Sequence, residues 1–419
     1  METILIRGGN RLQGEVEISS AKNSVLPILA ATILCEGEVV LQNFPMYDDT
    51  KNMLKILQDL GAKISFIDKS VKIDTSNITS CQISQEMASK LRSSIFSLGA
   101  ILGRCKKAKV GHPGGCTIGA RPIDLHIKGL ECLNAKITDR HGYITCDGKN
   151  MRGAIVNLDF PSVGATENIM MASVLIKGKT QIINCAKEPE IVDLANFLNK
   201  MGAKISGAGT SVMYIEGVKK LHSCVYKPIS DRIITGTYLI AGAMTRGSVC
   251  LTNTNSEHIS ALVSKLKNNG CKIHIKGDKI NLDCDKRLKN IAKIETLPYP
   301  GFPTDMQPQM MALMSICKGA GIIVENMFES RFKHVSFLNK MGADIVVKDK
   351  LAFIKGVPLL YGAEVESTDL RGGACLVLAG LVAEGYTKVK NVHYIDRGYE
   401  HIEKDLQCLG ANIERYIET

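Results

Sequence analysis

A cysteine in a loop rich in glycine and proline has the setting that most suggests chemistry. The stretch VGHPGGCTIGARPIDLH, residues 110–126, places Cys116 five residues before Arg121. Six glycines and prolines between Gly111 and Pro122 exclude both helix and regular strand. Most free cysteines are small core hydrophobes, but a nearby arginine and a helix start both lower the pKa of a thiol. We therefore expect Cys116 to react as an acid or a nucleophile.

The elements that position this loop recur along the whole chain. An amphipathic segment ending in LGAKI or a variant occurs six times in 419 residues. Its turn residues are separated by 73, 68, 68, 72 and 68 positions, and such a period is the mark of a repeat architecture. Glycine or asparagine there suits a left-handed helix C-cap. The six turn residues are Gly61, Asn134, Gly202, Gly270, Gly342 and Gly410.

Each repeat has the pattern strand, helix, strand, helix, strand, strand, which favours α/β domains over a helical solenoid. The sixth repeat lacks its last strands, and the N-terminal TILIRGG resembles the missing LAFIKGV-type strand. The chain is therefore expected to close on itself. We predict a first three-repeat domain over 22–230 and a second over 1–21 plus 231–419, with the active site in the cleft between them.

Charged side chains gather at the two loops of each repeat that precede helix N-termini. Free N–H groups and the helix dipole favour anions at such positions. Any one of these residues alone is most simply a solvated loop charge, but the set predicts a basic ring for a phosphate-rich substrate, with carboxylates for proton transfer. The first loops carry Lys22, Asn23, Arg92, Ser162, Gly164, Asp231, Arg232, Thr304, Asp305, Asp369 and Arg371; the second carry Asp48, Asp49, Arg121, Asp124, Lys187, Glu257, Arg331 and Arg397.

Composition excludes several other classes of protein. The net charge of +10 comes without long Lys/Arg runs or tryptophan, and aromatics are only 5%, so a small anionic substrate fits better than nucleic acid. The apolar run 374–383 is shorter than the roughly 20 residues of a membrane span, and METILIRGG has no signal core, which together favour a cytoplasmic protein. Fourteen scattered cysteines indicate reduced thiols, and nine histidines show no metal-ligand spacing. We expect no metal and no cofactor.

These motifs resemble, from end to end, the family of UDP-N-acetylglucosamine 1-carboxyvinyltransferases. The stretches SSAKNS, GGCTIGARPIDLH, FPSVGAT, PTDMQPQ, TDLRGGA and DRGYEHIE stand where the motifs of that family stand. The resemblance implies a two-domain inside-out α/β barrel, the enolpyruvyl transferase fold, built from six βαβαββ-like repeats. It implies that the enolpyruvyl group of phosphoenolpyruvate passes to the 3-hydroxyl of UDP-N-acetylglucosamine with release of phosphate, as the first committed step of peptidoglycan synthesis.

The resemblance also assigns roles to residues. Cys116 would protonate the methylene carbon of phosphoenolpyruvate and be the target of fosfomycin. Asp305 would accept the hydroxyl proton, with Asp369 beside it, and Lys22 and Arg397 complete the expected catalytic set. The substrate-binding residues expected in all are Lys22, Asn23, Arg92, Arg121, Pro122, Ile123, Asp124, Leu125, Ser162, Val163, Gly164, Asp305, Met327, Arg331, Arg371 and Arg397.

Two alternatives stay open from the sequence. One is the related shikimate-pathway transferase, which shares the fold and phosphoenolpyruvate; the Cys116 loop favours the UDP-sugar instead. The other is a non-catalytic paralogue that binds a UDP-sugar to sense precursor supply. One departure concerns Phe160, where some members carry a lysine that contacts the nucleotide.

Overall fold

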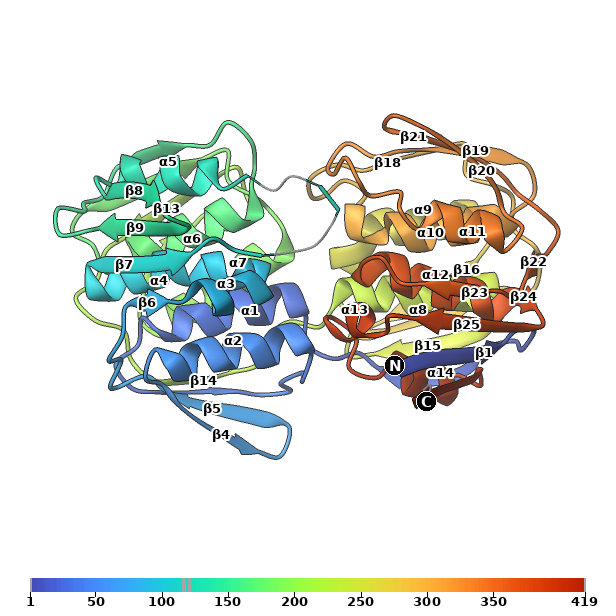
Figure 1. Ribbon diagram of the computed structural model, residues 1–419, viewed down its shortest axis with the longest axis horizontal. Helices are drawn as coiled ribbons and strands as arrows, with labels where there is room; N and C mark the ends of the chain where they lie inside the picture. The colour runs from blue at the N-terminus through green and yellow to red at the C-terminus, as the bar shows by residue number, and fades with distance from the viewer. Residues whose placement is uncertain (1, 115–117, 120–121, 418–419) are drawn as a thin grey trace. The chain divides into compact units, whose positions relative to one another are not determined.

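The computed structural model describes residues 2–114, 118–119 and 122–417. The contacts divide them into two compact units (Figure 1). Unit 1 takes the described residues of Met1–Ser19 and Ser230–Thr419, together with Ile118 and Gly119. Unit 2 takes those of Ser20–Cys116 and Arg121–Ile229. Cys116 and Arg121 themselves lie outside the described residues.

Six four-stranded sheets, three in each unit, share one topology. In each, a short edge strand runs parallel to its neighbour, which pairs antiparallel with the third strand, and the third pairs antiparallel with the fourth. The expected closure is confirmed: β1 pairs with β26, so that Ile4 faces Arg415, and β1 pairs on its other side with β25. The two ends of the chain therefore complete one sheet.

The strands follow the order of the sequence repeats. In unit 2 the sheets are β14 (Cys224–Tyr226)–β3 (Glu38–Leu41)–β5 (Ser70–Asp74)–β4 (Lys63–Ile67), β6 (Gln82–Ile83)–β7 (Lys107–Gly111)–β9 (Tyr143–Asp147)–β8 (Lys136–Arg140), and β10 (Ile155–Asn157)–β11 (Lys179–Ile183)–β13 (Val212–Glu216)–β12 (Lys204–Ser206). In unit 1 they are β2 (Gln13–Glu17)–β15 (Ser248–Thr252)–β17 (Lys279–Asp283)–β16 (Lys272–Lys276), β18 (Lys293–Glu295)–β19 (Ala320–Val324)–β21 (Leu351–Lys355)–β20 (Asp344–Lys348), and β23 (Glu364–Glu366)–β25 (Tyr386–Lys390)–β1 (Glu2–Arg7)–β26 (Asn412–Ile417), with a small pair β22 (Leu360–Tyr361)–β24 (Ala383–Glu384).

Each unit has three inner helices that are apolar nearly all round, as helices buried on every side must be. Figure 1 shows helices in the middle of each unit with strands around them. The inner helices are α1 (Lys22–Thr32), α4 (Phe96–Cys105) and α6 (Val163–Ser173) in unit 2, and α8 (Arg232–Met244), α10 (Gln307–Ile316) and α12 (Leu370–Val382) in unit 1. Because helices lie inside and no described sheet closes on itself, the architecture is an inside-out one of separate sheets.

Amphipathic helices form a second set outside the inner helices, beside the sheets, and each ends as the repeats predict. All six turn residues have the left-handed backbone expected of a helix C-cap; Gly61 has φ 108° and Asn134 has φ 69°. The outer helices are α2 (Asp48–Asp59), α5 (Asp124–Cys132), α7 (Pro189–Lys200), α9 (Ser260–Asn268), α11 (Val335–Lys340) and α14 (Ile402–Cys408); the short helices are α3 (Gln85–Lys90), α13 (His393–Asp396), η1 (Arg92–Ile95), η2 (Ser256–Ile259) and η3 (Thr304–Met306).

Besides the stretch that contains Ile118 and Gly119, the chain passes between the units after Ser19 and after Ile229, each time just after an edge strand. β2 precedes α1 in sequence but pairs with β15, and β14 precedes α8 but pairs with β3. Ser19 accepts a hydrogen bond from the Asp231 N–H within unit 1, and Ile229 accepts one from the Ala21 N–H within unit 2. The two passages are thus tied at neighbouring residues.

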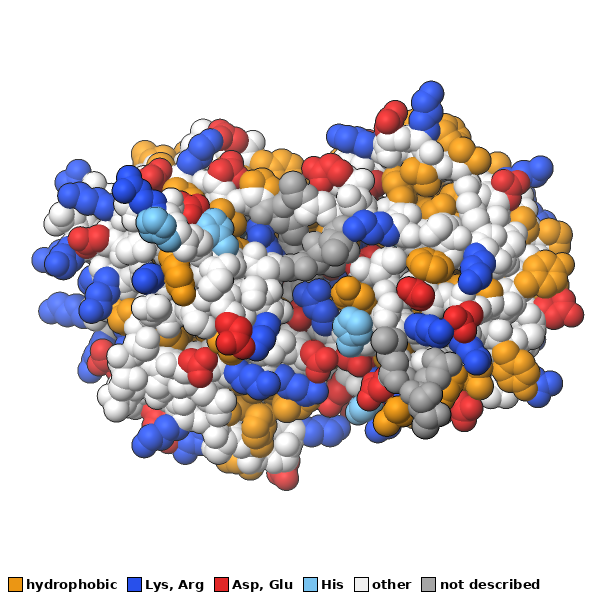
Figure 2. Space-filling view, viewed as in Figure 1, with side chains coloured by type: hydrophobic (Ala, Val, Ile, Leu, Met, Phe, Trp, Pro, Cys, Tyr) orange, Lys and Arg blue, Asp and Glu red, His pale blue; other side chains and the backbone are white. Residues whose placement is uncertain are grey.

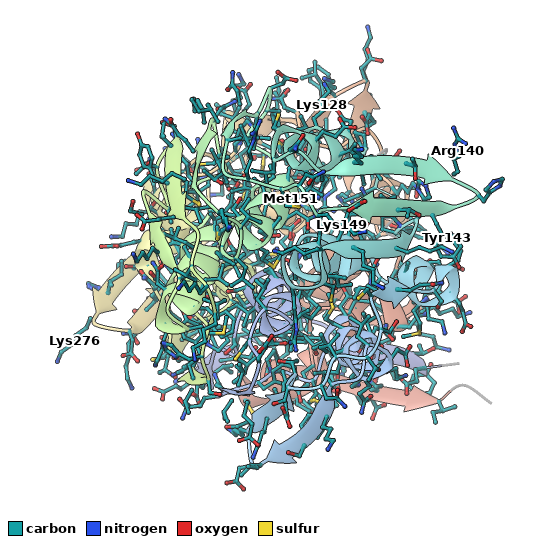
Figure 3. All side chains as sticks on the ribbon, turned by 90° about the vertical axis from the view of Figure 1, so that its left-hand side faces the viewer. Lys128, Arg140, Tyr143, Lys149, Met151 and Lys276 are labelled. Atoms are coloured by element: carbon teal, nitrogen blue, oxygen red, sulfur yellow. The ribbon has the colours of Figure 1, made fainter. Side chains whose placement is uncertain are left out.

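The outer surface is formed by hairpins and mixed charges. In Figure 3 Arg140 and Tyr143, which face each other across β8 and β9, mark the tip of one hairpin. On the face drawn in Figure 2, Lys and Arg side chains are interspersed with Asp and Glu. Among the helices that the structure describes, none combines the length and the apolar character that a membrane span requires.

Candidate functional site

Four predicted residues of unit 1 meet at the starts of α10 and α12, and we call Asp305, Arg331, Asp369 and Arg371 the Asp305 cluster. Arg371 donates to Asp305 Oδ2 from Nε (3.2 Å) and Nη2 (3.0 Å), and Arg331 Nη2 donates to Oδ1 (3.0 Å). The Asp305 side chain is 27% exposed, whereas both arginines are 2% exposed. The most accessible group of the cluster is therefore a carboxylate backed by two buried cations.

Burial and charge oppose each other at Arg371. Burial lowers the pKa of its guanidinium, but the carboxylate of Asp305, supported by Tyr399 and Asp231, outweighs burial and leaves the pKa raised. Close by, burial lowers the pKa of His334 to about 4, with Arg331 acting in the same direction and Asp369 opposing it. Arg371 therefore stays charged, and the neighbouring His334 is neutral near pH 7.

Asp305 can face the two arginines because it is not the N-cap of its own helix: the N-cap of η3 is Pro303. Asp369 caps α12 through the N–H groups of Arg371 and Gly372, and the same cap at 305 would use those of Gln307 and of residue 308. That residue is Pro308, which has none. The carboxylate faces the arginines instead, and η3 begins after Pro303 without a side-chain cap.

Glu325 organises the loop that carries the predicted residue Met327, and sequence reasoning missed it. Its side chain is buried and accepts from Thr296 Oγ1 (2.9 Å), Thr304 Oγ1 (3.0 Å) and the Met327 N–H (2.8 Å). In three other repeats the residue directly after the equivalent strand is a left-handed asparagine, for example Asn184 with φ 57°. That break in the repeat is the signal that could have identified Glu325.

Tyr399 is a second residue that sequence reasoning missed, and it contacts Arg371 through the nitrogen that does not bond Asp305. Its hydroxyl accepts from Arg371 Nη1 (3.4 Å) and lies 2.8 Å from Thr237 Oγ1, to which Gln309 Nε2 donates (3.2 Å). All of these side chains are buried. The DRGYEHIE motif contains Tyr399, but only the folded chain reveals its hydroxyl contact.

In unit 2, Lys22 is the first residue of α1 and lies almost buried. Its Nζ is 2.8 Å from Asp49 Oδ2 near the start of α2. The next residue but one, Ser24, donates to Asp193 on α7, which also accepts from Tyr226 (2.6 Å) and from the Ile229 N–H (3.1 Å). Lys22 is thereby fixed at the start of α1. Its ammonium group and the helix dipole would both attract a bound anion there.

Neutral hydrogen bonds organise the predicted Ser162–Gly164 loop. Ser162 caps α6 by accepting from the Ala165 N–H, and a Cβ at Gly164 would lie only 3.0 Å from His126 Cε1 on α5. His126 Nδ1 is 2.9 Å from Asn168 Nδ2, which also donates to the Ile95 carbonyl of η1 (2.9 Å). The starts of α5, α6 and η1 are therefore joined, and glycine allows the close approach.

The remaining predicted residues lie at or near the ends of helices. Arg92 opens η1, Ile123 precedes α5, and Asp124 and Leu125 begin it. Arg397 is the C-cap of α13 and lies in the loop that precedes α14, which begins at Ile402. Pro122, Asn23 and Val163 are among the described residues, whereas Cys116 and Arg121 are not. Within the described ranges, no group of three His, Cys, Asp or Glu side chains is arranged to hold a metal ion.

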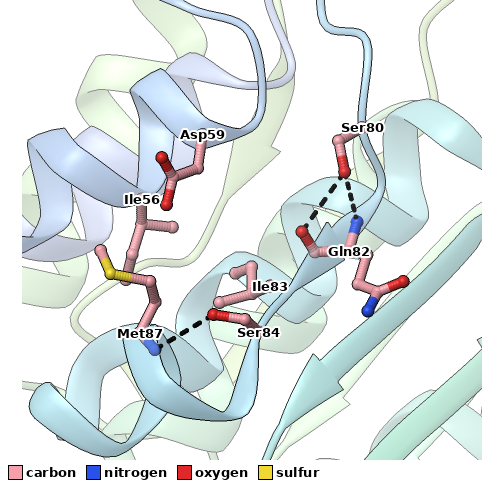
Figure 4. Close-up of a pocket in the computed structure, with 7 residues that line it drawn as sticks. All are labelled: Ile56, Asp59, Ser80, Gln82, Ile83, Ser84 and Met87. Atoms are coloured by element: carbon pink, nitrogen blue, oxygen red, sulfur yellow. Dashed lines mark hydrogen bonds between the residues drawn. The ribbon is translucent and has the colours of Figure 1, made fainter.

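A surface pocket of about 230 Å³ in unit 2 lies apart from all these residues (Figure 4). It is formed where α2 meets the start of α3, and its two serines are occupied: Ser84 caps α3 through the Met87 N–H, and Ser80 bonds with Gln82. Its one carboxylate, Asp59, has no basic residue in the lining. The pocket offers no chemistry comparable to that of the Asp305 cluster.

Over almost its whole length the chain is similar to proteins of known name. The chain is 52% identical to UDP-N-acetylglucosamine 1-carboxyvinyltransferase 2 of Caldanaerobacter subterraneus subsp. tengcongensis, over 98% of this chain and 99% of that protein. It is 49% identical to UDP-N-acetylglucosamine 1-carboxyvinyltransferase of Finegoldia magna, over 99% of both.

Solved structures confirm the expected fold. The enolpyruvyl transferase NikO from Streptomyces tendae superposes with a TM-score of 0.89 at 22% identity, over 100% of this chain and 99% of that one. EPSP synthase from Acinetobacter baumannii gives 0.74 at 17% identity over the whole of both chains. The family model of EPSP synthase (3-phosphoshikimate 1-carboxyvinyltransferase) matches residues 6–406. The chain therefore belongs to the EPSP synthase family of enolpyruvyl transferases, and within it to the UDP-N-acetylglucosamine 1-carboxyvinyltransferases.

Proposed function

We propose that this protein transfers the enolpyruvyl group of phosphoenolpyruvate to the 3-hydroxyl of UDP-N-acetylglucosamine and releases phosphate. The observation that carries the proposal is the Asp305 carboxylate, partly exposed and backed by two buried arginines. The names of full-length relatives at 46–52% identity supply the two substrates. In a bacterial cell this reaction is the committed entry to peptidoglycan synthesis.

The reaction is an addition followed by an elimination. The sugar oxygen forms a bond to C2 of phosphoenolpyruvate while its proton passes to Asp305, and C3 receives a proton from the Cys116 thiol. The Cys116 thiolate then takes a proton back from C3, and the bond from C2 to the phosphate oxygen breaks with its electron pair going to the phosphate. The phosphate leaves with the proton held by Asp305, which gives the enol ether and restores both side chains. General acid and base groups of this kind each contribute about 10²–10⁴-fold.

Cations hold the anionic partner in this scheme. Lys22, Arg121 and Arg397 are proposed to bind the phosphate and carboxylate of phosphoenolpyruvate, with Asn23 and Arg371 supporting them. Arginine forks match both groups bidentately. The sugar nucleotide is proposed to contact Arg92, Ser162, Val163, Gly164, Met327 and the stretch Pro122, Ile123, Asp124 and Leu125. The roles therefore draw on residues of both units.

The test is phosphate release from phosphoenolpyruvate with and without UDP-N-acetylglucosamine. We expect release only when both are present, and no release with shikimate 3-phosphate in place of the sugar nucleotide. Release with shikimate 3-phosphate alone would assign the protein to the other branch of its family. Tight UDP-sugar binding without phosphate release would indicate the non-catalytic sensor.

Fosfomycin tests the assignment of the thiol. We expect the drug to abolish turnover and to label Cys116, as located by mass spectrometry of the inactivated protein. Loss of activity with the label on one of the other thirteen cysteines would remove Cys116 from the mechanism.

A further inference from the structure

The two arginines that hold Asp305 are fixed to different degrees. Arg371 uses all three of its nitrogens: Nε and Nη2 donate to Asp305, and Nη1 donates to Tyr399. Thr237 and Gln309 continue that chain of hydrogen bonds into the helix interior. Arg371 is therefore locked in one position.

Arg331 is held far less completely. Its Nη2 donates to Asp305 Oδ1 (3.0 Å) and to the Thr304 carbonyl (3.3 Å), but its Nε is buried without a hydrogen-bond partner. Its Nη1 lies 3.6 Å from Asp369 Oδ1, which is an ion pair but too long for a good hydrogen bond. The Arg331 guanidinium is thus hydrogen-bonded to Asp305 and lies close to the second carboxylate, that of Asp369.

Asp369 is a fixed second partner. Its Oδ1 accepts from the Arg371 N–H (3.0 Å) and the Gly372 N–H (3.1 Å) as the N-cap of α12, and its side chain is 1% exposed. A charge-assisted bond at about 2.9 Å needs Arg331 to move by only ~0.7 Å. Asp369 can therefore accept this bond from Arg331 without moving itself.

We propose that Arg331 is a positioning residue that exchanges its charge between Asp305 and Asp369, so that Asp305 Oδ1 is released to take the hydroxyl proton. The inference rests on the proposed function. A carboxylate clasped by two arginines holds a proton weakly, which makes it a poor base. When Asp305 becomes neutral by accepting the proton, Arg331 keeps a charged partner in Asp369, so no cation is left unpaired in the buried site.

Several other titratable groups surround the cluster and are not substituted in the variants below, among them the buried Cys375 of α12, which Asp369 also influences. Arg371 faces Asp305 from α12, with Asp231 of the α8 start behind it. His334 faces both Arg331 and Asp369 from the start of α11, and Glu325 reaches the η3 turn through Thr304. None of these groups changes partner in the proposed exchange.

The experiment compares Asp369→Asn and Arg331→Lys with the wild-type chain. Asparagine caps helices as well as aspartate does, so α12 is preserved while the second carboxylate loses its charge. Arg331 then stays on Asp305: the acidic limb of the kcat–pH profile should move down by about one pH unit and plateau kcat should fall at least about tenfold, with KM nearly unchanged. Lysine lacks the fork that spans both carboxylates, so Arg331→Lys should move the limb up by about one unit.

A second measurement does not depend on turnover. With ¹³Cγ-labelled aspartate and the Asp305 signal assigned from Asp305→Asn, NMR titration should show a lower pKa for Asp305 in Asp369→Asn and a higher one in Arg331→Lys. Asp405→Asn is the control, because it neutralises another aspartate of unit 1 that bonds Tyr238 (2.6 Å) away from the cluster.

The outcomes separate the inference from the function. A wild-type chain that releases no phosphate rejects the proposed function, while the NMR shifts still decide whether Arg331 divides its charge. An active wild type whose Asp369→Asn variant keeps full plateau kcat, or whose two variants shift Asp305 in the same direction, overturns the exchange. The same shift in Asp405→Asn as in Asp369→Asn also overturns it.

Discussion

The starts of α12 and α10 carry the same two residue types and use them differently. At α12, Thr368 is followed by Asp369, whose Oδ1 caps the helix through two N–H groups. At α10, Thr304 is followed by Asp305, which lies inside η3 and whose carboxylate pairs with two arginines. The difference shows that two similar helix starts use one residue type in two ways: Asp369 is the N-cap of its helix, whereas Asp305 lies inside η3 and pairs with two arginines.

Unit 2 presents another set of residues at its equivalent helix starts. Lys22 opens α1, Arg92 opens η1 ahead of α4, and Ser162 caps α6. Unit 1 has Asp231, Asp305 and Asp369 at the corresponding positions. The pseudo-symmetric halves have therefore diverged in charge: one supplies cations and a neutral cap, and the other supplies carboxylates.

The largest effect should come from neutralising the Asp305 carboxylate. Asp305→Asn should reduce kcat by about 10²–10⁴-fold, the range expected for a general base, with a much smaller change in UDP-N-acetylglucosamine affinity. Steady-state phosphate release and calorimetric binding measure the two quantities. Near-normal turnover would remove Asp305 from the role of general base and would end the distinction between the two helix starts.

In unit 2 the comparable test is the buried pair of Lys22 and Asp49. Lys22→Met leaves the Asp49 carboxylate, 3% exposed, without its ammonium partner, and should cost about 3–5 kcal/mol of unfolding free energy. Adding Asp49→Asn should restore most of the stability but not the phosphoenolpyruvate affinity. Urea unfolding and ligand titration separate these effects. If the double variant recovers phosphoenolpyruvate binding, Lys22 serves only the fold.

The repeats predicted the framework because their signals are local. A left-handed C-cap needs Gly or Asn whatever surrounds it, so Gly61 and Asn134 could be assigned from sequence, as could the closure through β1. Partner choice in the site is not local. Thr368-Asp369 and Thr304-Asp305 read alike, and only the folded arrangement shows which aspartate meets Arg331 and Arg371. The chain also gave no local hint of the hydroxyl contact made by Tyr399, which joins α12 to residues of α8 and α10.

Each unit also buries a titratable group whose pKa is shifted mainly by burial, Glu167 in unit 2 and His334 in unit 1, and the two should respond to pH in opposite directions. Burial raises the pKa of Glu167 well above its ordinary value, with Glu190 and Glu188 adding to the effect, so its favourable contribution is present at low pH and lost as pH rises. His334 has a pKa lowered to about 4, so its contribution is complete above about 6.5 and is lost as pH falls toward 4, by about 3 kcal/mol at most.

Substituting each group should therefore flatten a different side of the stability profile. We expect Glu167→Gln to stabilise the protein at pH 7–8 and His334→Gln to reduce its loss of stability between pH 6.5 and 4. Urea unfolding followed by circular dichroism across pH 4–8 measures both. His393→Gln, at an exposed histidine, is the control for His334. A pH dependence unchanged in both variants would show that neither buried group titrates with unfolding.

The smallest effect tests why the two helix starts differ. Pro308→Ala adds an N–H at the third position after Asp305, beside the one that Gln307 already has at the second. Both donors of a cap like that of Asp369 are then present, and we expect them to draw the carboxylate away from Arg331 and Arg371. Since a cap is worth about 1 kcal/mol, kcat should fall by about fivefold while the protein becomes no less stable. Phosphate release measured beside Pro189→Ala controls for loss of a helix-start proline, because Pro189 opens α7 next to Glu188 in the other unit. Equal activity in Pro308→Ala and the wild type would mean that the two arginines hold Asp305 more strongly than a cap can compete for it, and Pro308 would then not be the reason that Asp305 is available.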